Sequence, residues 1–391
     1  MLFAADQNKL LKVLNDVSCA SKKGTDYPEL AGVLIQADIS SGQVVFSCTD
    51  TNTFLQKRIT DARIKEAGTV LLNAQLLKKI VEMAEQNIVI AGDEKNIAVI
   101  FGQTRFDLQA LPSKKFPMPQ ITYPDQTIQV SGLRSLIYRS IFAVSQKKED
   151  NSILESVRFT FNKEAGSARA ADRAAFVIAD LPLCSDGELD IILHQDPLSI
   201  LYSISNNNDR YYIGVSSGKA VIMNDQTLFV TKLMHGDFLN TEQLIQKFQP
   251  KSRALTDAKE LYRAIDRCMI SVQDNTDYSI HVMIGDRFIA LETATCYGMV
   301  KDKISAADTA SQSPDGFHYN PDKMISFLKN ASGPLELLMD KQGCMLMKAN
   351  NSVYFLAPRR QANIRKKKAD SAKAAGHKKN ESTAEQLQIA A

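Results

Sequence analysis

The sequence lacks any long apolar run. No segment approaches the ~18 apolar residues that a membrane-spanning helix needs. The first 18 residues, MLFAADQNKLLKVLNDVS, place charged side chains where a signal peptide would be apolar. We therefore expect a cytoplasmic protein. With 391 residues, 44% hydrophobic and 23% charged, the chain is typical of a globular protein with about two to four domains.

Clustered metal-binding or redox residues are also absent. The six cysteines form no CxxC pair, and none of the five histidines has a Cys or acidic partner at ligand or triad spacing. The segment GVSSGKA (214–220) differs from a phosphate-binding loop, because its first glycine is one residue too close and Ala220 replaces the metal-binding hydroxyl. We expect reduced thiols, no metal, no cofactor and no catalytic residues, so the chain is not expected to be an enzyme.

Charge is unevenly placed along the chain. Nine of the 47 Lys and Arg residues, but three of the 44 acidic residues, lie from Arg359 onward, so residues 1–358 carry a net charge of −3 although the whole chain carries +3. A nucleic-acid surface on this acidic body must therefore gather its basic groups on one face.

Six segments have the periodicity of amphipathic helices, and their starts recur at a fixed interval. One series begins at Asp6, Ser131 and Thr256, with steps of 125 and 125 residues, and the other at Asn73, Asp196 and Asn320, with steps of 123 and 124. Short β-rich runs lie between them. The pattern predicts an α+β fold of three tandem repeats, 1–126, 127–251 and 252–360, each with two helices. Three unrelated α+β domains of similar size are the alternative.

Several sequence motifs in these repeats resemble those of the bacterial β sliding clamp, the β subunit of DNA polymerase III. RFDLQALPSKKFP (105–117) is similar to the family segment R-F-x-L-x-x-L-P-x-x-x-F-P, and TLFVTKLMHGDFLN (227–240) to F-x-x-K-L-x-x-G-x-F-P-D. YFLAPRR (354–360) resembles the family's closing Y-V-V-M-P-M-R. The resemblance covers residues 1–360. It implies three DNA clamp domains in a ring-shaped head-to-tail homodimer, with helices lining a channel and sheets outside.

The resemblance also implies a function. A clamp of this family is a processivity factor that encircles double-stranded DNA without sequence preference. It tethers the replicative DNA polymerase, and it binds the clamp loader and other replication and repair proteins, through short linear peptides. The alternative is a clamp-fold regulatory or decoy dimer that binds replication proteins without encircling DNA.

Basic residues on the six helices are candidates for DNA contact. The helices carry eleven Lys and Arg residues against seven acidic ones, for a sum of +4. A lysine on one helix is also typical of a solvated face, so the sum over all six helices carries the inference. With two basic loop pairs, the candidates are Lys9, Lys12, Lys22, Lys23, Lys78, Lys79, Arg134, Arg139, Lys147, Lys148, Lys259, Arg263 and Arg267.

The resemblance places a peptide-binding pocket between the second and third repeats. By position, its residues are Leu154, Ala171, Asp172, Arg173, Ala174, Phe176, Leu239, Leu244, Phe355, Ala357 and Pro358. The family motif T-D-G-H-R-L is replaced here by ADRAAF (171–176), and M-P-M is replaced by APR (357–359). The pocket is therefore expected to be apolar but altered in shape. A plain interdomain seam is the alternative interpretation.

The resemblance also implies a dimer interface. By position it contains Phe106 in the first repeat, and Met269 with Ile270 at the end of the fifth helix.

Residues 361–391 form a tail beyond the family's closing motif. They are rich in Lys, Ala, Ser and Gln and have no aromatic residue, which predicts a disordered basic tail. A solubilising extension is one interpretation, and a DNA tether beside the ring is the other.

We predict that deletion after Arg360 flattens the salt dependence of binding to short linear duplexes. If four to six tail charges engage phosphates, the tail contributes about 4–5 to the slope of log affinity against log salt. Dimerisation and retention on circular DNA should not change. An unchanged slope in the truncated protein would leave the tail as a solvated extension.

Overall fold

The computed structural model describes residues 1–22, 24–146, 152–182, 184–270, 272, 278–295, 298–311 and 316–359. The chain divides into two compact units, residues 1–171 with 179–239, and residues 172–178 with 240–391. No helix in the described part is long and apolar enough to cross a membrane. The candidate residues Lys23, Lys147 and Lys148 and the tail from 361 lie outside the described residues.

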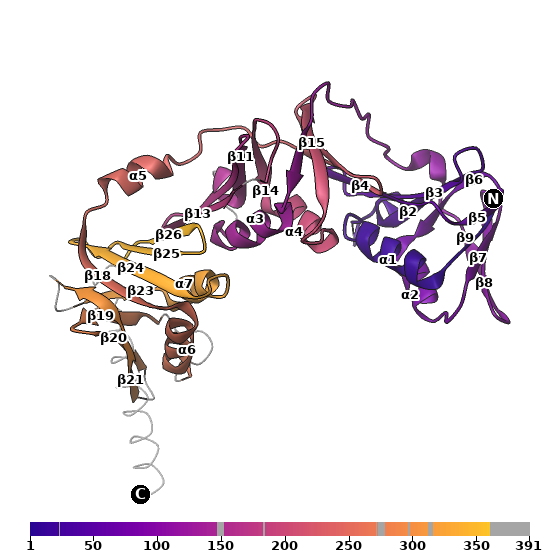
Figure 1. Cartoon of the computed structure of the whole chain (residues 1–391). Coiled ribbons are helices and arrows are strands. Elements are labelled where there is room, and N and C mark those ends of the chain that lie inside the picture. The colour runs from indigo at the N-terminus through magenta and orange to yellow at the C-terminus, as the bar shows by residue number, and fades with distance from the viewer. Residues whose placement is uncertain are drawn as a thin grey trace, which may run out of the picture. The chain divides into compact units, whose positions relative to one another are not determined.

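The N-terminal end of the first unit is built on a five-stranded antiparallel sheet (Figure 1). Its order is β5 (Arg63–Glu66), β1 (Leu2–Ala5), β7 (Ile88–Gly92), β8 (Asn96–Phe101) and β9 (Thr104–Gln109). Helices α1 (Gln7–Ser18) and α2 (Ala74–Glu82) pack against each other. Leu10, Leu14, Leu77 and Ile80 point into the core, as the helical periodicity predicts.

An eight-stranded antiparallel sheet joins the first two predicted repeats. Its order is β10 (Ile128–Ser131), β15 (Arg210–Ser216), β16 (Lys219–Met223), β17 (Thr227–Lys232), β4 (Thr53–Ile59), β3 (Gln43–Thr49), β2 (Gly32–Asp38) and β6 (Gly68–Asn73). The β17–β4 pair runs from Thr227 opposite Lys57 to Thr231 opposite Thr53. One buried cluster lies over this joint and contains Leu34, Phe54, Leu71, Phe116, Val221, Leu228 and Val230.

The rest of the first unit adds the strands β14 (Leu189–His194), β11 (Ser156–Phe161) and β12 (Ala165–Ala171), in that order. Helices α3 (Leu133–Ser140) and α4 (Gln195–Ile204) pack against each other beside them. Strand β13 (Ala175–Pro182) begins in the second unit and ends in the first. Short 3-10 turns span Pro28–Ala31, Ser113–Lys115, Ile141–Ala143 and Ser152–Glu155.

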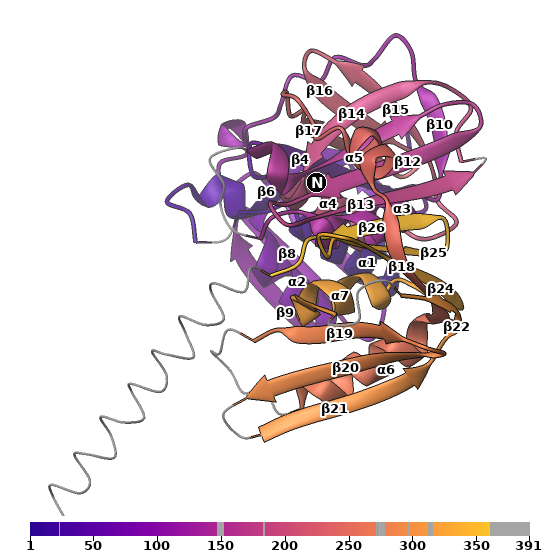
Figure 2. The same cartoon turned by 90° about the vertical axis from the view of Figure 1, so that its left-hand side faces the viewer.

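The second unit holds two further antiparallel groups of strands. The first has the order β26 (Ser352–Leu356), β25 (Met345–Ala349), β24 (Pro334–Asp340), β18 (Pro250–Asp257) and β22 (Ala307–Ala310). The second has the order β21 (Gly298–Ser305), β20 (Phe288–Thr295), β19 (Ile280–Gly285) and β23 (Phe317–Tyr319), and Figure 2 shows β19, β20 and β21 side by side. Helices α6 (Ala258–Met269) and α7 (Pro321–Leu328) pack against each other, and α5 (Thr241–Lys247) precedes β18.

Three of the six predicted helix starts are confirmed. Asp6, Asn73 and Asn320 are N-caps whose side chains accept from backbone N–H groups, and Pro321 takes the first helical position.

The other three starts were wrong by one or two residues. Gly132, at φ 68°, replaces Ser131, and Asp257 replaces Thr256 because its carboxylate accepts from two backbone N–H groups. His194 replaces Asp196 as the cap of α4, because its Nδ1 accepts from the Asp196 N–H at 3.2 Å. Helix α5 was not predicted.

Candidate nucleic-acid and partner interfaces

The candidate basic residues of the first repeat are exposed or half-buried, on α1 and α2 or, for Lys22, in the loop after α1. Lys12, Lys22 and Lys79 are exposed. Lys9 is also exposed and pairs with Asp61, and half-buried Lys78 lies 3.8 Å from Glu82 one turn later. Exposed ion pairs of this kind contribute little to stability, so these charges remain accessible to a polyanion.

The third repeat presents a second exposed set on α6. Lys259 and Arg263 are exposed, and Arg267 contacts Asp302 on β21 at 2.6 Å. The exposed basic side chains recur at intervals of four residues, which places them on one face of the helix. The opposite face, with Leu261, Ile265 and Cys268, is buried.

Arg134 differs from the other candidates because its half-buried guanidinium is held by hydrogen bonds to backbone carbonyls. It donates to the carbonyl oxygen of Ser205 at 2.6 Å and to that of Tyr202, at the C-terminal end of α4. Its Cζ also lies 4.0 Å from the centre of the Tyr202 ring. A cation at this place satisfies carbonyls that a helix end leaves without partners. Arg139, on the same helix, is half-buried.

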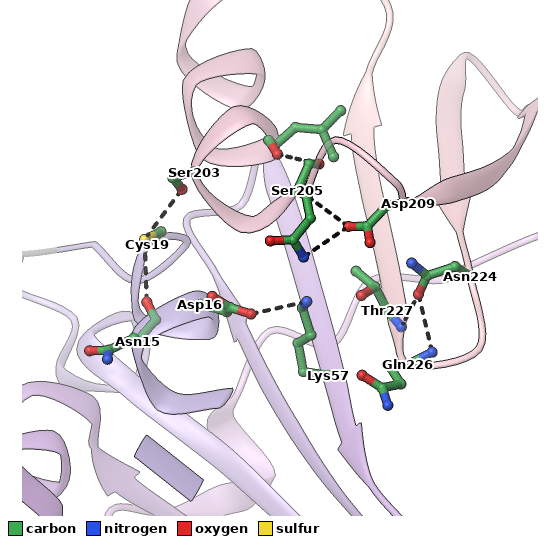
Figure 3. A network of polar contacts seen from close by, with 12 residues as sticks. Asn15, Asp16, Cys19, Lys57, Ser203, Ser205, Asp209, Asn224, Gln226 and Thr227 are labelled. Atoms are coloured by element: carbon green, nitrogen blue, oxygen red, sulfur yellow. Dashed lines mark hydrogen bonds and ion pairs between the residues drawn. The ribbon is translucent and has the colours of Figure 1, made fainter. Parts of the chain in front are cut away.

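A polar network fixes α1 within the first unit (Figure 3). Asp16 of α1 pairs with Lys57 of β4 at 3.0 Å, with side chains only 16% and 11% exposed. Burial raises the pKa of Asp16, and the nearby Lys57 ammonium opposes that shift. Beside them, Ser203 Oγ of α4 donates to Cys19 Sγ at 3.8 Å. The ion pair holds α1 to β4, and the Ser203–Cys19 contact joins the end of α1 to α4.

Most of the candidate pocket residues lie in the second unit. Asp172 Oδ1 accepts from the N–H groups of Ala174 and Ala175 at 2.8 Å each, and the carboxylate also pairs with Lys323 of α7. The Ala357 N–H donates to the Ala174 carbonyl at 2.8 Å. The 171–176 turn is therefore fixed to the end of β26.

Two phenylalanines form the aromatic part of this group. The rings of Phe176 and Phe355 are stacked, with centroids 4.9 Å apart and an interplanar angle of 4°. Phe176 is 2% exposed, whereas Phe355 and Pro358 are half-buried. The candidate pocket residues of this unit also include Arg173, which is exposed, and Leu244 of α5, which is 39% exposed.

Three candidate pocket residues belong to the first unit. Leu154 is half-buried in a 3-10 turn, and its carbonyl accepts from the Ser145 N–H at 2.8 Å. Ala171 is buried, and Leu239 is 43% exposed. That the candidate residues of the first unit and those of the second unit line one pocket stays a prediction.

The candidate dimer residues lie at accessible positions. Half-buried Phe106 is on β9, the outermost strand of its sheet, and stacks on Phe101 with centroids 6.1 Å apart. Ile270, at the end of α6, is 81% exposed, while Met269 is half-buried. Strand β21 is likewise outermost in its sheet.

One hollow in the first unit was not predicted from the sequence. It measures about 400 Å³ and is lined by Arg158, Asp190 and the 233–238 segment. Arg158 Nε donates to Asp190 at 2.9 Å, and this hydrogen bond lowers the pKa of Asp190. Among the described residues, no group of three or more His, Cys, Asp or Glu is placed to hold a metal ion.

Comparison with known proteins places this geometry in a known fold. A family model described as the N-terminal domain of the DNA polymerase III beta subunit matches residues 1–121. The structure resembles a putative DNA polymerase III beta subunit from Eubacterium rectale with a TM-score of 0.84 at 19% identity, over 92% of this chain and 99% of that one. The chain has the sliding-clamp fold.

Named relatives of this clamp-fold chain agree with the structural match. The beta sliding clamp of Bacillus subtilis is 26% identical over 70% of this chain and 75% of its own length. That of Chlamydia muridarum is 23% identical over 86% of this chain and 91% of its own. A sliding clamp from Pseudomonas aeruginosa, solved bound to griselimycin, matches with a TM-score of 0.82 at 19% identity, over 92% of this chain and 99% of that one.

Proposed function

We propose that this chain is a DNA sliding clamp, a non-catalytic processivity factor that encircles duplex DNA and tethers a replicative polymerase. The observation that carries the proposal is the match to solved clamps over 92% of the chain. The relatives' names agree with it. We place this function in the cytoplasm, and we divide the chain into three clamp domains, 1–126, 127–251 and 252–360.

The basic helix surface supports a contact with DNA that does not read sequence. Lys9, Lys12, Lys79, Lys259 and Arg263 are exposed on helices, where they reach phosphates rather than base edges. Phosphate contacts are the same at every base pair, so a protein that uses them slides along the duplex. The acidic balance of residues 1–358 keeps this attraction weak away from the helices.

Two outermost strands support a head-to-tail homodimer. Strand β9 in the first domain and β21 in the third each have a neighbouring strand on one side. An unpaired edge exposes backbone N–H and C=O groups that a second chain satisfies by adding a strand. Pairing β9 of one copy with β21 of another generates two identical junctions and closes the ring after two copies. Phe106 and Ile270 supply the apolar contact beside the strands.

The aromatic pair supports a docking place for linear peptides of the polymerase and the clamp loader. Phe355 rests one ring face on the buried Phe176, and the side chains of Leu244 and Pro358 are apolar and partly exposed. An anchor side chain that covers such a surface gains roughly 1.5–3 kcal/mol. Leu154, Ala171 and Leu239, which belong to the first unit, remain sequence-based candidates for peptide contact.

A regulatory or decoy dimer is the second candidate function. The observation that favours it is the change of the 171–176 turn from T-D-G-H-R-L to ADRAAF, with the Asp172 carboxylate paired to Lys323. Such a dimer would bind replication proteins without encircling DNA.

Retention on DNA distinguishes the two functions. We predict that the protein, loaded on a nicked circular plasmid by a bacterial clamp loader, stays with the DNA through gel filtration and dissociates after the plasmid is linearised. The physical reason is topological, since a closed ring leaves only over a free end. Equal dissociation from circular and linear DNA would support the decoy dimer.

We predict that Met269→Ala with Ile270→Ala yields monomers in sedimentation at micromolar concentration, because the exposed apolar surface beside the junction is removed. Ile39→Ala is the matched control, since Ile39 is 55% exposed but lies on a turn far from both outermost strands in sequence. A double variant that remains dimeric would show that the junction lies elsewhere.

We predict that Phe355→Ala abolishes polymerase stimulation and leaves the dimer intact. Removing the ring takes away one anchor surface, and a decrease of roughly 1.5–3 kcal/mol in binding free energy weakens a peptide about tenfold or more. Phe355→Leu keeps an apolar side chain and should retain part of the stimulation. Unchanged processivity of the alanine variant, at an unchanged melting temperature, would mean that partners dock at another place.

A further inference from the structure

Three side chains from α3 and α4 form a stacked column on the surface of the first unit. The rings of Tyr138 and Tyr202 lie nearly parallel, with centroids 5.8 Å apart and an interplanar angle of 11°. The guanidinium of Arg134 covers Tyr202, 4.0 Å from its centroid. Because Arg134 is also bonded to two carbonyls at the end of α4, the column is anchored to that helix.

The two hydroxyl groups of this column are available as hydrogen-bond donors. Tyr138 is 45% exposed and Tyr202 is half-buried, and neither hydroxyl has a protein partner among the described residues. Two buried tyrosines of this fold behave differently: Tyr211 bonds Ser205 and Asp209, and Tyr319 bonds the Gly343 carbonyl. Stacking orients the rings in advance, so a ligand that accepts from the hydroxyls does not have to order them.

The charges around the column favour an anionic acceptor. Helix α3 carries Arg134 and Arg139 and no acidic residue. Helix α4 has no Lys or Arg, and its acidic residue, Asp196, lies six residues before Tyr202, or about 9 Å along the helix. The residue after Tyr202, Ser203, contacts Cys19 beside α1, the helix that carries Lys9 and Lys12. The cations nearest the column in sequence are therefore those of α3, and the acidic Asp16 close to Cys19 is paired with Lys57.

We propose that Tyr138 and Tyr202 donate hydrogen bonds from their hydroxyl groups to backbone phosphates of duplex DNA. This proposal rests on the proposed clamp function and adds a neutral contact to it. Within a duplex the faces of the bases are stacked on one another, so the polar tip of a tyrosine meets the phosphates first. Arg134 and Tyr138 both pack against the Tyr202 ring, which leaves its hydroxyl as the group that contacts a ligand.

Because a phenol is neutral, this contact differs from a lysine contact in how DNA binding depends on salt. A lysine or arginine that binds a phosphate displaces a condensed cation from DNA, and each such contact adds about 0.9 to the salt slope. A neutral hydroxyl donates its proton to the phosphate oxygen without displacing a cation. The Tyr138–Tyr202 contact therefore holds DNA at salt concentrations that weaken the lysines.

The test compares the double variant Tyr138→Phe with Tyr202→Phe against Lys12→Gln, using fluorescence anisotropy of a short linear duplex over a series of salt concentrations. The phenylalanines keep the stack and remove the hydroxyls. We expect affinity to fall about 3- to 10-fold at every salt concentration with an unchanged slope. Lys12→Gln should instead lower the slope by about 0.9 for each phosphate that the side chain no longer neutralises.

Several outcomes overturn the proposal. Wild-type affinity of the double phenylalanine variant at all salt concentrations would refute the hydroxyl contact. Weakening in Tyr138→Ala with Tyr202→Ala but not in the phenylalanine variant would assign the column to stacking. A changed slope in the phenylalanine variant would mean that the substitution removes cations rather than phenols from the DNA contact. Wild-type protein that binds no short duplex but stays on circular DNA refutes this contact alone, whereas failure to stay on circular DNA refutes the proposed function, so the two failures are kept apart. Melting temperature and sedimentation confirm that each variant is folded and dimeric.

Discussion

The pairing of β17 with β4 is the constraint on which the first unit depends. Each strand would otherwise be the edge of a smaller sheet, with a row of backbone N–H and C=O groups left to water. Their hydrogen bonds make one eight-stranded sheet, and the shared cluster around Phe54 and Leu228 buries the joint. The ion pair of Asp16 with Lys57 then fixes α1, because Lys57 is itself a residue of β4. Two sequence repeats thus fold as one unit.

A comparable constraint organises the candidate peptide site in the second unit. The Asp172 carboxylate holds the 171–176 turn through two backbone N–H groups, and the same carboxylate pairs with Lys323 of α7. The backbone bond from Ala357 to Ala174 keeps Phe355 over Phe176. A changed sequence in this turn therefore alters the surface offered to a peptide while the backbone path is kept.

Basic residues on the helices differ in what their charge is used for. Lys12, Lys79 and Arg263 project into solvent, whereas Arg134 satisfies the carbonyls that end α4 and covers Tyr202. Sequence periodicity treats these residues alike, because it reports the face of a helix and not the contacts of a side chain. The Arg134 example shows why a count of cations overstates the charge available to a polyanion.

The sequence by itself determined the α+β class, the repeat and most helix positions, because these depend on local periodicity and on capping side chains such as Asp6, Asn73 and Asn320. It also contained the sequence motifs that resemble those of the clamp family. It did not locate α5, a short helix with little amphipathic pattern, or the cap of α4, where His194 competes with Asp196.

Only the tertiary structure decided which elements join across repeats and which side chains meet. The β17–β4 joint pairs residues about 170 positions apart, and the Arg134–Tyr202–Tyr138 column brings two helices together. Such contacts depend on the path of the whole chain. No local pattern encodes them, because each partner alone looks like an ordinary strand or an ordinary exposed helix residue.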